Sequence, residues 1–205
     1  FSISPSPIEL SDYFQRVLHK TKTPKFEQVK YLPESGYIRA QLGKVAAYLD
    51  VGRIGPEYLM GHAHADTLTF ELSYNKQRLI VNTGTSCYGL SKQRLKQRGT
   101  AAHNTVVIEN KNSSEIWDSF RVAKRAYPGE VKIQNIAGTE GISVSCSHNG
   151  YLRIEPDLVH TRSWKILHNM DKPYAVDPAK GGSQRMTGAK RPYYALTTIP
   201  TQLDS

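Results

Sequence analysis

Residues 61–74 of the chain read GHAHADTLTFELSY, and the pattern of this stretch decides the fold that the rest of the sequence suggests. Its last eight residues alternate apolar and polar side chains, which is the period of a half-buried β-strand. The same alternation, extended backwards, places His62, His64 and Asp66 on the face that also carries Leu68 and Phe70. We therefore expect a strand whose inward-facing row ends in two imidazoles and a carboxylate, at the rim of a core.

Short candidate strands, separated by Gly, Pro and Asn, lie on both sides of this stretch. Two hairpins are expected, one turning at Gly43-Lys44 and the other at Asn75-Lys76-Gln77. Because no helix of crossover length separates the strands, the pattern predicts an all-β fold, an antiparallel β-sandwich, rather than a parallel sheet. The expected strands are residues 37–42, 45–50, 67–74, 78–82, 105–109, 120–126, 131–136, 142–147, 151–155 and 159–167.

The two ends of the chain differ from this sandwich region. Ser6-Pro7-Ile8-Glu9 is a capping box with proline at the first helical position, and it predicts a short amphipathic helix that runs to about His19. We expect residues 1–30 to be helix and linker, 31–167 the sandwich domain, and 168–205 a tail. Proline and glycine interrupt every candidate element of the tail, so we expect it to be poorly ordered and without strand pairing.

The composition is typical of a globular protein, since 39% of the 205 residues are hydrophobic and 22% are charged. No apolar run is long enough for a transmembrane helix. The sequence begins without a methionine or a secretory signal pattern, so we interpret it as a piece of a longer protein. Cys87 and Cys146 are expected to be free thiols, with one disulfide as the alternative.

A net charge of +9 indicates a polyanionic partner, either nucleic acid or an acidic polysaccharide. Part of this charge lies in Lys92, Arg94, Lys96 and Arg98, in an expected loop that leads to His103. The sequence has no helix-turn-helix, no zinc-finger spacing and no aromatic RNA-binding strand, so we do not expect a nucleic-acid partner.

Three segments of the chain carry side chains that could hold a metal ion. The first carries His62 and His64, the second ends at Asn82 after an expected strand, and the third brings His103 just ahead of another. Two histidines on one strand face, joined by a third from elsewhere, are a common zinc site. The alternative is that these imidazoles only form hydrogen bonds with the neighbouring backbone.

Two common metal-site patterns fit poorly, because a metallo-β-lactamase needs a histidine in place of Thr67 and a cupin needs a glutamate nearer than Glu71. A third pattern fits, and the sequence closely resembles the heparinase II/III-like family. The matching blocks are residues 61–68, 79–85, 98–106, 113–117, 119–122, 151–153 and 160–162. Members of this family are polysaccharide lyases that cleave uronic-acid-containing glycans, such as heparan sulfate or alginate, by β-elimination. Their fold is an α/α toroid followed by an antiparallel β-sandwich, with the active site between them, and this chain resembles the sandwich.

The resemblance also implies roles for particular residues. His62 is implied to be a catalytic base or acid. Tyr88 is implied to be a second catalytic group, with a packed aromatic side chain as the alternative. Arg94 and Arg98 are expected to bind the anionic groups of the substrate, since an arginine can hold a carboxylate with two hydrogen bonds. The remaining large aromatic side chains are expected in the core, with a sugar platform as the alternative for Trp117. These side chains are Tyr37, Trp117, Phe120 and Trp164.

The metal ligands implied by the resemblance are His64, Asn82 and His103, which match a zinc site of structural type. The family usually has an aspartate where this chain has Asn82, and a neutral amide is a weaker ligand than a carboxylate. Asp66 could therefore replace Asn82 as the third ligand. A hydrogen-bonded cluster without a metal is the further alternative.

The function expected from the sequence is therefore that of a polysaccharide lyase acting on an acidic polysaccharide, exported to the periplasm or secreted. Without the toroid, the isolated chain is expected to have little or no activity. Two other functions remain open: a non-catalytic module that binds acidic glycans, and a metal-dependent hydrolase whose ion activates water. Only a lyase would release products with a C4–C5 double bond.

Overall fold

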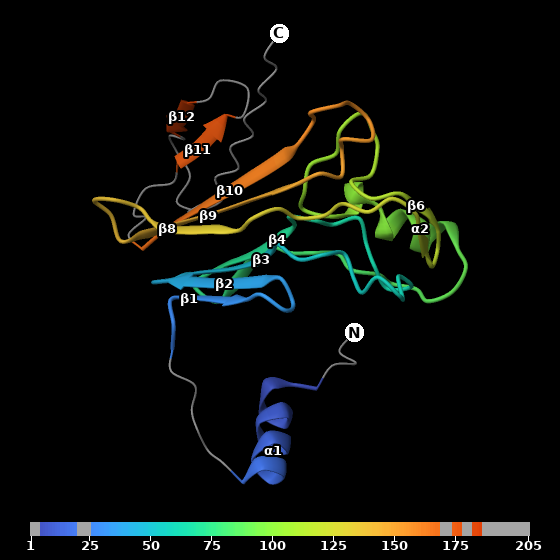
Figure 1. The fold of residues 1–205 in the computed structure, drawn as a ribbon. Helices are drawn as coiled ribbons and strands as arrows, with labels where there is room; N and C mark the ends of the chain where they lie inside the picture. The colour runs from blue at the N-terminus through green and yellow to red at the C-terminus, as the bar shows by residue number, and fades with distance from the viewer. Residues whose placement is uncertain (1–4, 20–25, 169–173, 178–181, 186–205) are drawn as a thin grey trace.

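A computed structural model of the chain describes residues 5–19, 26–168, 174–177 and 182–185. Two antiparallel sheets lie one above the other, with a short helix and a small two-stranded ribbon at one end (Figure 1). The elements are α1 (Pro7–Leu18), β1 (Val29–Leu32), β2 (Tyr37–Leu42), β3 (Val45–Asp50), β4 (Phe70–Tyr74), β5 (Gln77–Ile80), α2 (Lys92–Arg98), the 3-10 helix η1 (Thr100–Ala102), β6 (Ile116–Asp118), β7 (Arg121–Val122), β8 (Lys132–Asn135), β9 (Gly141–His148), β10 (His160–Leu167), β11 (Tyr174–Asp177) and β12 (Gly182–Arg185).

The first sheet has the order β1-β2-β3-β4-β5, so its strands pair in the order in which they follow one another along the chain. Both predicted hairpins are present. Gly43 has φ 54° between β2 and β3, while Asn75 and Lys76 have φ 48° and 65° between β4 and β5. Two successive residues with positive φ give a hairpin turn whose twist matches that of its strands. These turns fix the register, which pairs Ala40 with Ala47 in the first hairpin.

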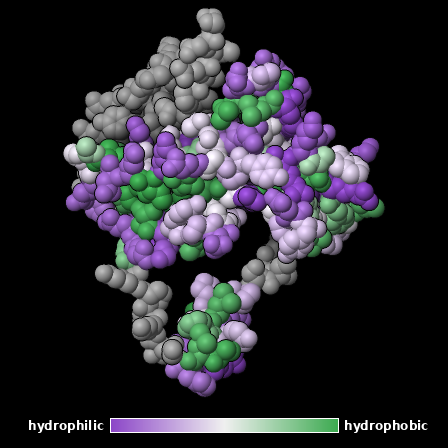
Figure 2. Space-filling model, in the orientation of Figure 1, coloured by the Kyte–Doolittle hydropathy of each residue, from purple (hydrophilic) through white to green (hydrophobic). Residues whose placement is uncertain are grey.

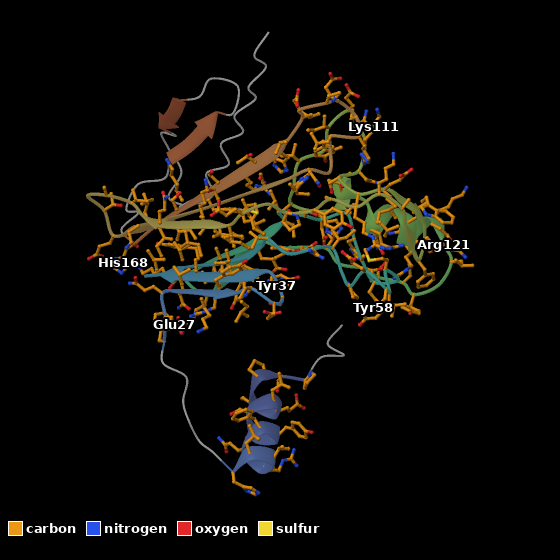
Figure 3. The ribbon with its side chains drawn as sticks, in the orientation of Figure 1. Glu27, Tyr37, Tyr58, Lys111, Arg121 and His168 are labelled. Carbon is orange, nitrogen blue, oxygen red and sulfur yellow. The ribbon has the colours of Figure 1, made fainter. Side chains whose placement is uncertain are left out.

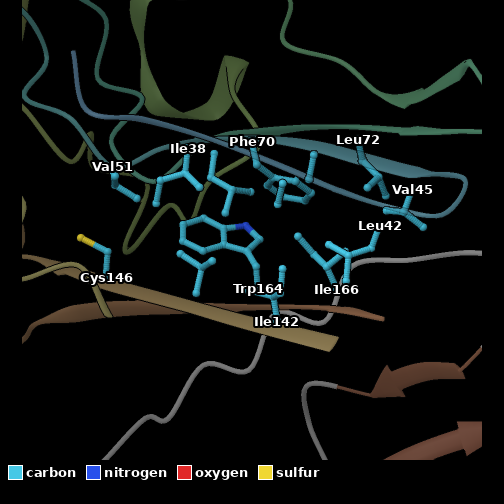
Figure 4. Packing of buried hydrophobic residues seen from close by; sticks show 14 of the residues in the cluster. Ile38, Leu42, Val45, Val51, Phe70, Leu72, Ile142, Cys146, Trp164 and Ile166 are labelled. Carbon is cyan, nitrogen blue, oxygen red and sulfur yellow. The ribbon is translucent and has the colours of Figure 1, made fainter. Parts of the chain in front are cut away.

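The second sheet has the order β10-β9-β8, and the core lies between it and the first sheet (Figure 4). Alternate residues of β9 and β10 are buried, as expected for strands with one covered face. Trp164 of β10 meets the ring of Phe70 of β4 at 6.4 Å, which joins the two sheets. Each buried aliphatic side chain contributes about 1.5–3 kcal/mol by leaving water, so this core stabilises the sandwich. The predicted antiparallel β-sandwich is thus confirmed.

Several local predictions were wrong, for identifiable reasons. The strand expected from residue 67 begins only at Phe70, because Leu68 has φ 64° and interrupts the extended backbone. Residues 105–109 and 151–155 are turns and bends rather than strands, apart from a single bridge at Ile108. Residues 92–98, expected as a loop, form α2, which Ser91 caps by accepting a hydrogen bond from the main-chain N–H of Arg94 at 3.1 Å.

The N-terminal helix is confirmed as α1, and its predicted capping box is present. The Ser6 hydroxyl accepts from the Glu9 main-chain N–H at 3.2 Å, and the Glu9 carboxylate accepts from the Ser6 N–H at 2.6 Å. No residue of α1 is buried, and its apolar side chains appear as green patches on the helix in Figure 2. Its most exposed apolar residues are Ile8, Tyr13 and Val17.

The tail was expected to lack strand pairing, and this expectation is wrong for the part of it that the structure describes. β11 and β12 pair antiparallel, with Tyr174 opposite Arg185. The prolines at residues 173 and 178 flank β11 instead of interrupting it, so they remove no hydrogen bond from its ladder. The other tail residues after His168 lie outside the described residues.

Cys87 is half-buried and Cys146 is buried, and both are free thiols, as preferred from the sequence. Among the residues that the structure describes, no helix has the length and apolar character needed to cross a membrane.

Candidate functional site

The candidate site begins on the segment that joins β3 to β4. Ala65 is buried there, and its N–H donates to the Arg98 carbonyl at 2.8 Å. The side chains of His62, His64 and Asp66 alternate with buried ones, so His62 is exposed and the other two are half-buried. The alternation predicted an inward-facing row shared with Leu68 and Phe70. Instead the segment is not a strand, and the three side chains lie on its less buried side.

The side chain of Arg98 holds this segment in place by hydrogen bonds to its main chain. Its guanidinium donates from Nε to Ala63 O at 2.7 Å and from Nη2 to Met60 O at 3.1 Å. The remaining nitrogen, Nη1, donates to Asp118 O at 2.7 Å, which connects the segment to β6. Arg98 is fully buried. Every guanidinium nitrogen therefore donates to a main-chain carbonyl, and a rigid fork suits this task better than a lysine would.

The predicted substrate-binding role of Arg94 and Arg98 is not what this geometry favours. Arg94 is only 1% exposed, and its three guanidinium nitrogens also donate to main-chain carbonyls. A buried guanidinium whose donors are engaged cannot hold a carboxylate of a substrate in the bidentate manner expected. Their positions on α2 explain the difference: Lys92 and Lys96 lie on the exposed side of that helix, whereas the arginines lie on its buried side.

His64, Asp66 and His103 form a group whose candidate ligand atoms all lie within 4.8 Å of one another. Nδ1 of His64 lies 3.2 Å from Nε2 of His103. In a tetrahedral zinc site with bonds of about 2.0–2.1 Å, two nitrogen ligands would be about 3.3 Å apart. The donor set of two imidazoles and a carboxylate therefore fits zinc in both chemistry and spacing.

Burial shifts the pKa values of His64, His103 and Asp66. It lowers the pKa of His64 to about 4, with further lowering from His103 and Arg98, and burial likewise lowers the pKa of His103 to about 4. Both rings are therefore neutral near pH 7 and can offer lone pairs. Burial, together with the carboxylate of Asp50, raises the pKa of Asp66 to about 7. A bound cation would offset the cost of ionising this carboxyl group.

Asn82, predicted as the third ligand, lies on the other side of His103. Its Oδ1 is 2.7 Å from Nδ1 of His103, and because Oδ1 can only accept, Nδ1 must carry the proton. Nε2 of His103 then presents its lone pair to His64. Asn82 thus occupies the place that an outer hydrogen-bond partner of a histidine ligand has in zinc sites. The carboxylate of the group is that of Asp66, the alternative third ligand expected from the sequence.

His62 and Tyr88 lie together at the surface. Their ring centroids are 5.6 Å apart, and Tyr88 is 72% exposed. Tyr88 in turn meets the edge of Phe120 at 5.2 Å. The structure thus brings together both residues predicted to be catalytic, although they are distant in sequence and on different segments. Two exposed groups of this kind can each exchange a proton with a bound molecule.

A hollow of about 360 Å³ opens beside Asn82 on the outer face of the first sheet. Tyr37 and Tyr48 line it and are about half exposed, so the prediction that Tyr37 belongs to the core was wrong. Asp50 lies at its inner end, where burial raises its pKa to about 6. Trp117, also expected in the core, is 54% exposed, whereas Trp164 is buried as predicted.

Sequence reasoning missed a second group of buried polar residues, between the ends of β9 and β10. His148 Nε2 and His160 Nδ1 are 2.9 Å apart, and the two side chains are 1% and 3% exposed. It also missed Asn104, whose side-chain amide donates to Phe70 O at 3.1 Å and Val81 O at 2.9 Å. The only available signal for Asn104 was its place next to His103.

Comparison with solved structures supports the same fold. Heparan sulfate lyase HepC from Pedobacter heparinus is 22% identical over 77% of this chain, with a TM-score of 0.52. A structure of heparinase III is 18% identical over 79% of this chain, with a TM-score of 0.55. At these identities the likeness concerns the fold alone. The chain spans 23% of the length of the HepC structure and 28% of that heparinase III. No curated protein matches the sequence.

Comparison with protein-family models is more decisive, because it covers most of the chain. The model described as heparinase II/III-like, C-terminal, matches residues 24–189. This range includes both sheets, α2 and every candidate site residue described above. The chain therefore belongs to the heparinase II/III-like family, as a C-terminal domain of that family.

Proposed function

We propose that this chain is the β-sandwich domain of a polysaccharide lyase that cleaves a uronic-acid-containing glycan by β-elimination. The observation that carries this proposal is the contact between His62 and Tyr88. Their rings meet at 5.6 Å on the exposed side of a segment that buried side chains fasten. Family membership supplies the reaction class, and the paired rings supply two groups able to transfer protons.

The chemistry of elimination requires both groups. The proton on C5 of a uronate is weakly acidic because it is adjacent to the carboxylate carbon. A base removes it, the C4–C5 double bond forms, the C4–O4 bond breaks, and an acid protonates the departing oxygen. In this proposal His62 accepts the C5 proton and Tyr88 protonates the O4 oxygen. The group that neutralises the substrate carboxylate would come from the α/α domain that the family resemblance implies.

The metal site would brace the catalytic residues without contacting the substrate. His64, His103 and Asp66 would hold the ion, and Asn82 would orient His103 from behind. Bound zinc would cross-link two segments that are distant in the sequence, and the hydrogen bond from His103 to Asn82 would attach a third. Because His64 is two residues from His62, this cross-link would limit the movement of the catalytic imidazole.

An acidic polysaccharide is the partner that the surface charge favours. The chain carries a formal charge of +9, and Lys92 and Lys96 are exposed on α2. Figure 3 places Arg121 at the same end of the sandwich as α2 and opposite to His168. Long-range attraction by such a basic end increases the local concentration of a polyanion. Export to the periplasm or beyond belongs to this proposal, since acidic polysaccharides of this kind lie outside the cell.

The direct test is a lyase assay in which this domain is combined with an α/α domain. Residues 24–189 would replace the corresponding C-terminal domain of heparinase III, and heparan sulfate and alginate would be the substrates. The proposal predicts products that absorb ultraviolet light because of their C4–C5 double bond. His62→Ala should reduce the rate at least about a hundredfold, in the range expected for loss of a general base. His168→Ala, at the exposed opposite end of the sandwich, is the matched control and should leave the rate unchanged.

Other outcomes would point to the two competing functions. Cleavage that leaves no double bond, and that a chelator abolishes, would indicate a metal-dependent hydrolase. Glycan binding with no cleavage, unchanged in His62→Ala, would indicate a binding module. Either result, obtained with a folded chimera, would overturn the proposed elimination.

A further inference from the structure

Arg94 of α2 lies behind the pair formed by His62 and Tyr88. Its side chain is 1% exposed, and each of its three guanidinium nitrogens donates to a different main-chain carbonyl. The three carbonyls belong to the residues directly before His62, Tyr88 and Phe120. The bonds run from Nη2 to Gly61 O at 2.8 Å, from Nη1 to Cys87 O at 3.2 Å and from Nε to Ser119 O at 2.9 Å.

The rings that follow these carbonyls form a row with Tyr88 in the middle, and Arg94 lies against two of them. His62 meets Tyr88 at 5.6 Å, and Tyr88 meets Phe120 at 5.2 Å. The central carbon of the Arg94 guanidinium lies 5.0 Å from the centre of the Tyr88 ring and 4.5 Å from that of Phe120. One side chain therefore restrains the backbone ahead of all three rings and also lies against the faces of two of them.

This use of an arginine is unusual in one respect. Buried charges are ordinarily paired with opposite charges, because an unpaired charge is costly away from water. Within the described residues, neither Arg94 nor Arg98 forms an ion pair, and carbonyl dipoles satisfy both guanidinium groups instead. A neutral side chain could not supply three donors in one plane, and a lysine would offer them from a single atom.

We propose that Arg94 is a positioning residue that sets the distance and orientation between His62 and Tyr88. It reaches no substrate, and it acts through the backbone carbonyls before the two rings. The inference rests on the proposed function in one respect: the spacing of the pair matters because one group is to take a proton and the other is to give one. Misplacement by about 1 Å of such groups can cost a large part of the rate.

The alternative is that Arg94 only stabilises the fold, as other buried arginines do. Arg162 of β10 provides a matched comparison, because it is 6% exposed and its Nη1 donates to Leu68 O at 2.6 Å and to Asn104 O at 2.5 Å. It also lies 4.9 Å from the centre of the Phe70 ring. Arg162 thus shares the burial, carbonyl bonds and ring contact of Arg94, but it touches neither His62 nor Tyr88 among the contacts described.

The test measures ring proximity by NMR in the chain of residues 1–205, with its histidine and tyrosine rings labelled. The wild type should show a nuclear Overhauser effect between the rings of His62 and Tyr88, assigned by its loss in His62→Gln and Tyr88→Phe. In Arg94→Lys we expect this cross-peak to disappear and the His62 ring protons to lose the shift caused by the neighbouring tyrosine ring. In Arg162→Lys, both signals should be retained even if the melting temperature falls.

The proposal would be overturned if folded Arg94→Lys kept the cross-peak and the ring shifts of the wild type. It would also be overturned if Arg162→Lys lost both as completely as Arg94→Lys. If Arg94→Lys does not fold, the wild type offers a second measurement: the Arg94 side-chain NH signals. Because all three nitrogens donate hydrogen bonds, the guanidinium group should rotate slowly and its protons should exchange slowly with water, compared with those of the exposed Arg16. Rapid rotation or exchange would contradict the positioning role of Arg94.

The outcome does not depend on lyase activity. A chimera that eliminates while Arg94→Lys keeps the wild-type ring contact would uphold the proposed function and reject the positioning role. A lost ring contact together with an inactive chimera would do the reverse.

Discussion

At the scale of single residues, an amide at Asn82 in place of the carboxylate that the family resemblance implies changes which residues would hold the proposed zinc ion. The family resemblance implies an aspartate ligand there, whereas Asn82 Oδ1 accepts a hydrogen bond from His103 Nδ1 at 2.7 Å. Asp66 lies within 4.8 Å of both imidazoles and can supply the missing charge.

Asp66→Asn should therefore weaken zinc binding at least about tenfold, because it removes the only anionic ligand of the proposed set. The affinity would be measured by competition with a chromophoric chelator at about pH 8, above the pKa of about 7 to which burial raises Asp66. Asp157→Asn, at an exposed turn, makes the same change in charge away from the site and is the control. An unchanged affinity in Asp66→Asn would show that Asp66 is not a ligand.

Asn82→Asp should have the opposite effect. A carboxylate would accept the His103 Nδ1–H more strongly than an amide does, which makes Nε2 a better ligand, and such outer partners change metal affinity by about 10–100-fold. The same competition titration should show a gain of about tenfold. If Asn82→Asp binds zinc no more tightly than the wild type, the hydrogen bond to His103 does not tune the site.

At the scale of elements, β9 and β10 carry a pair of histidines that must stay neutral. The Gly150 N–H donates to His148 Nδ1 at 3.1 Å, so His148 carries its proton on Nε2 and donates to His160 Nδ1. His160 then holds its proton on Nε2, which has no hydrogen-bond partner among the described residues. Burial lowers the pKa of His148 to about 3, helped by His160 and Arg153, and burial lowers the pKa of His160 to about 4, helped by Arg162.

This pair predicts a loss of stability in mild acid. Because the folded pKa values lie below the ordinary 6.5, the unfolded chain binds more protons between these limits, and the contribution of the pair falls as pH falls below about 6.5. Between about pH 6.5 and 5 the loss should be about 2 kcal/mol for each histidine. Urea unfolding at a series of pH values would measure it.

The comparison variant is His160→Asn, whose amide oxygen can take the place of Nδ1. Asp50 and Asp66, with pKa values raised to about 6 and 7, act in the opposite direction in both proteins, so the difference between wild type and variant is the measured quantity. The variant should lose less stability than the wild type on acidification. Parallel pH profiles would contradict the role assigned to the pair.

In contrast to the histidine pair, we expect helix α1 to contribute little to the stability of the sandwich, because none of its residues is buried. Removing residues 1–19 should leave the melting temperature of the sandwich within about 2 °C, since no core contact is lost. A fall of several degrees would show that α1 packs on the sandwich in solution.

Elements with regular patterns were predictable from the sequence, and elements set by distant contacts were not. The capping box of α1 and the alternation in β2, β3 and β9 are local, so they were found. Residues 151–155 were mistaken for a strand because Tyr151 is held by a distant partner, with its hydroxyl donating to Val106 O at 2.5 Å. Helix α2 was missed because two of its four basic residues are buried, which obscured its amphipathic pattern.

In the candidate site, too, features that depend on local sequence were predictable, and features that depend on distant contacts were not. The residues of the metal group could be identified from their types and spacing, and His62 and Tyr88 from the family resemblance. The burial of Arg94 and Arg98 could not be inferred, because their partners are backbone carbonyls that the sequence does not distinguish. Whether Asn82 is a ligand or a hydrogen-bond partner depends on which ring nitrogen of His103 it approaches, and that too is a property of the folded chain.

At the scale of the whole molecule, the sandwich carries the site at one end instead of enclosing it. His62 and Tyr88 are exposed there, and the basic residues of α2 lie at the same end. In the proposed lyase this exposed pair is completed by a second domain, and the chain spans 23% and 28% of the length of the two solved structures it resembles. The core between the sheets then serves to hold three segments in register beneath the exposed pair.

Whether His64 and Asp66 hold one ion together with His103, with Asn82 behind it, is tested most directly by the zinc content of the purified chain. We predict about one zinc ion per wild-type chain, and none in the double variant His64→Ala/His103→Ala, while a His148→Ala variant that still folds retains the ion. Wild-type protein that is folded, supplied with zinc and still free of bound metal would contradict the metal site. His64, Asn82 and His103 would then be held together by hydrogen bonds alone.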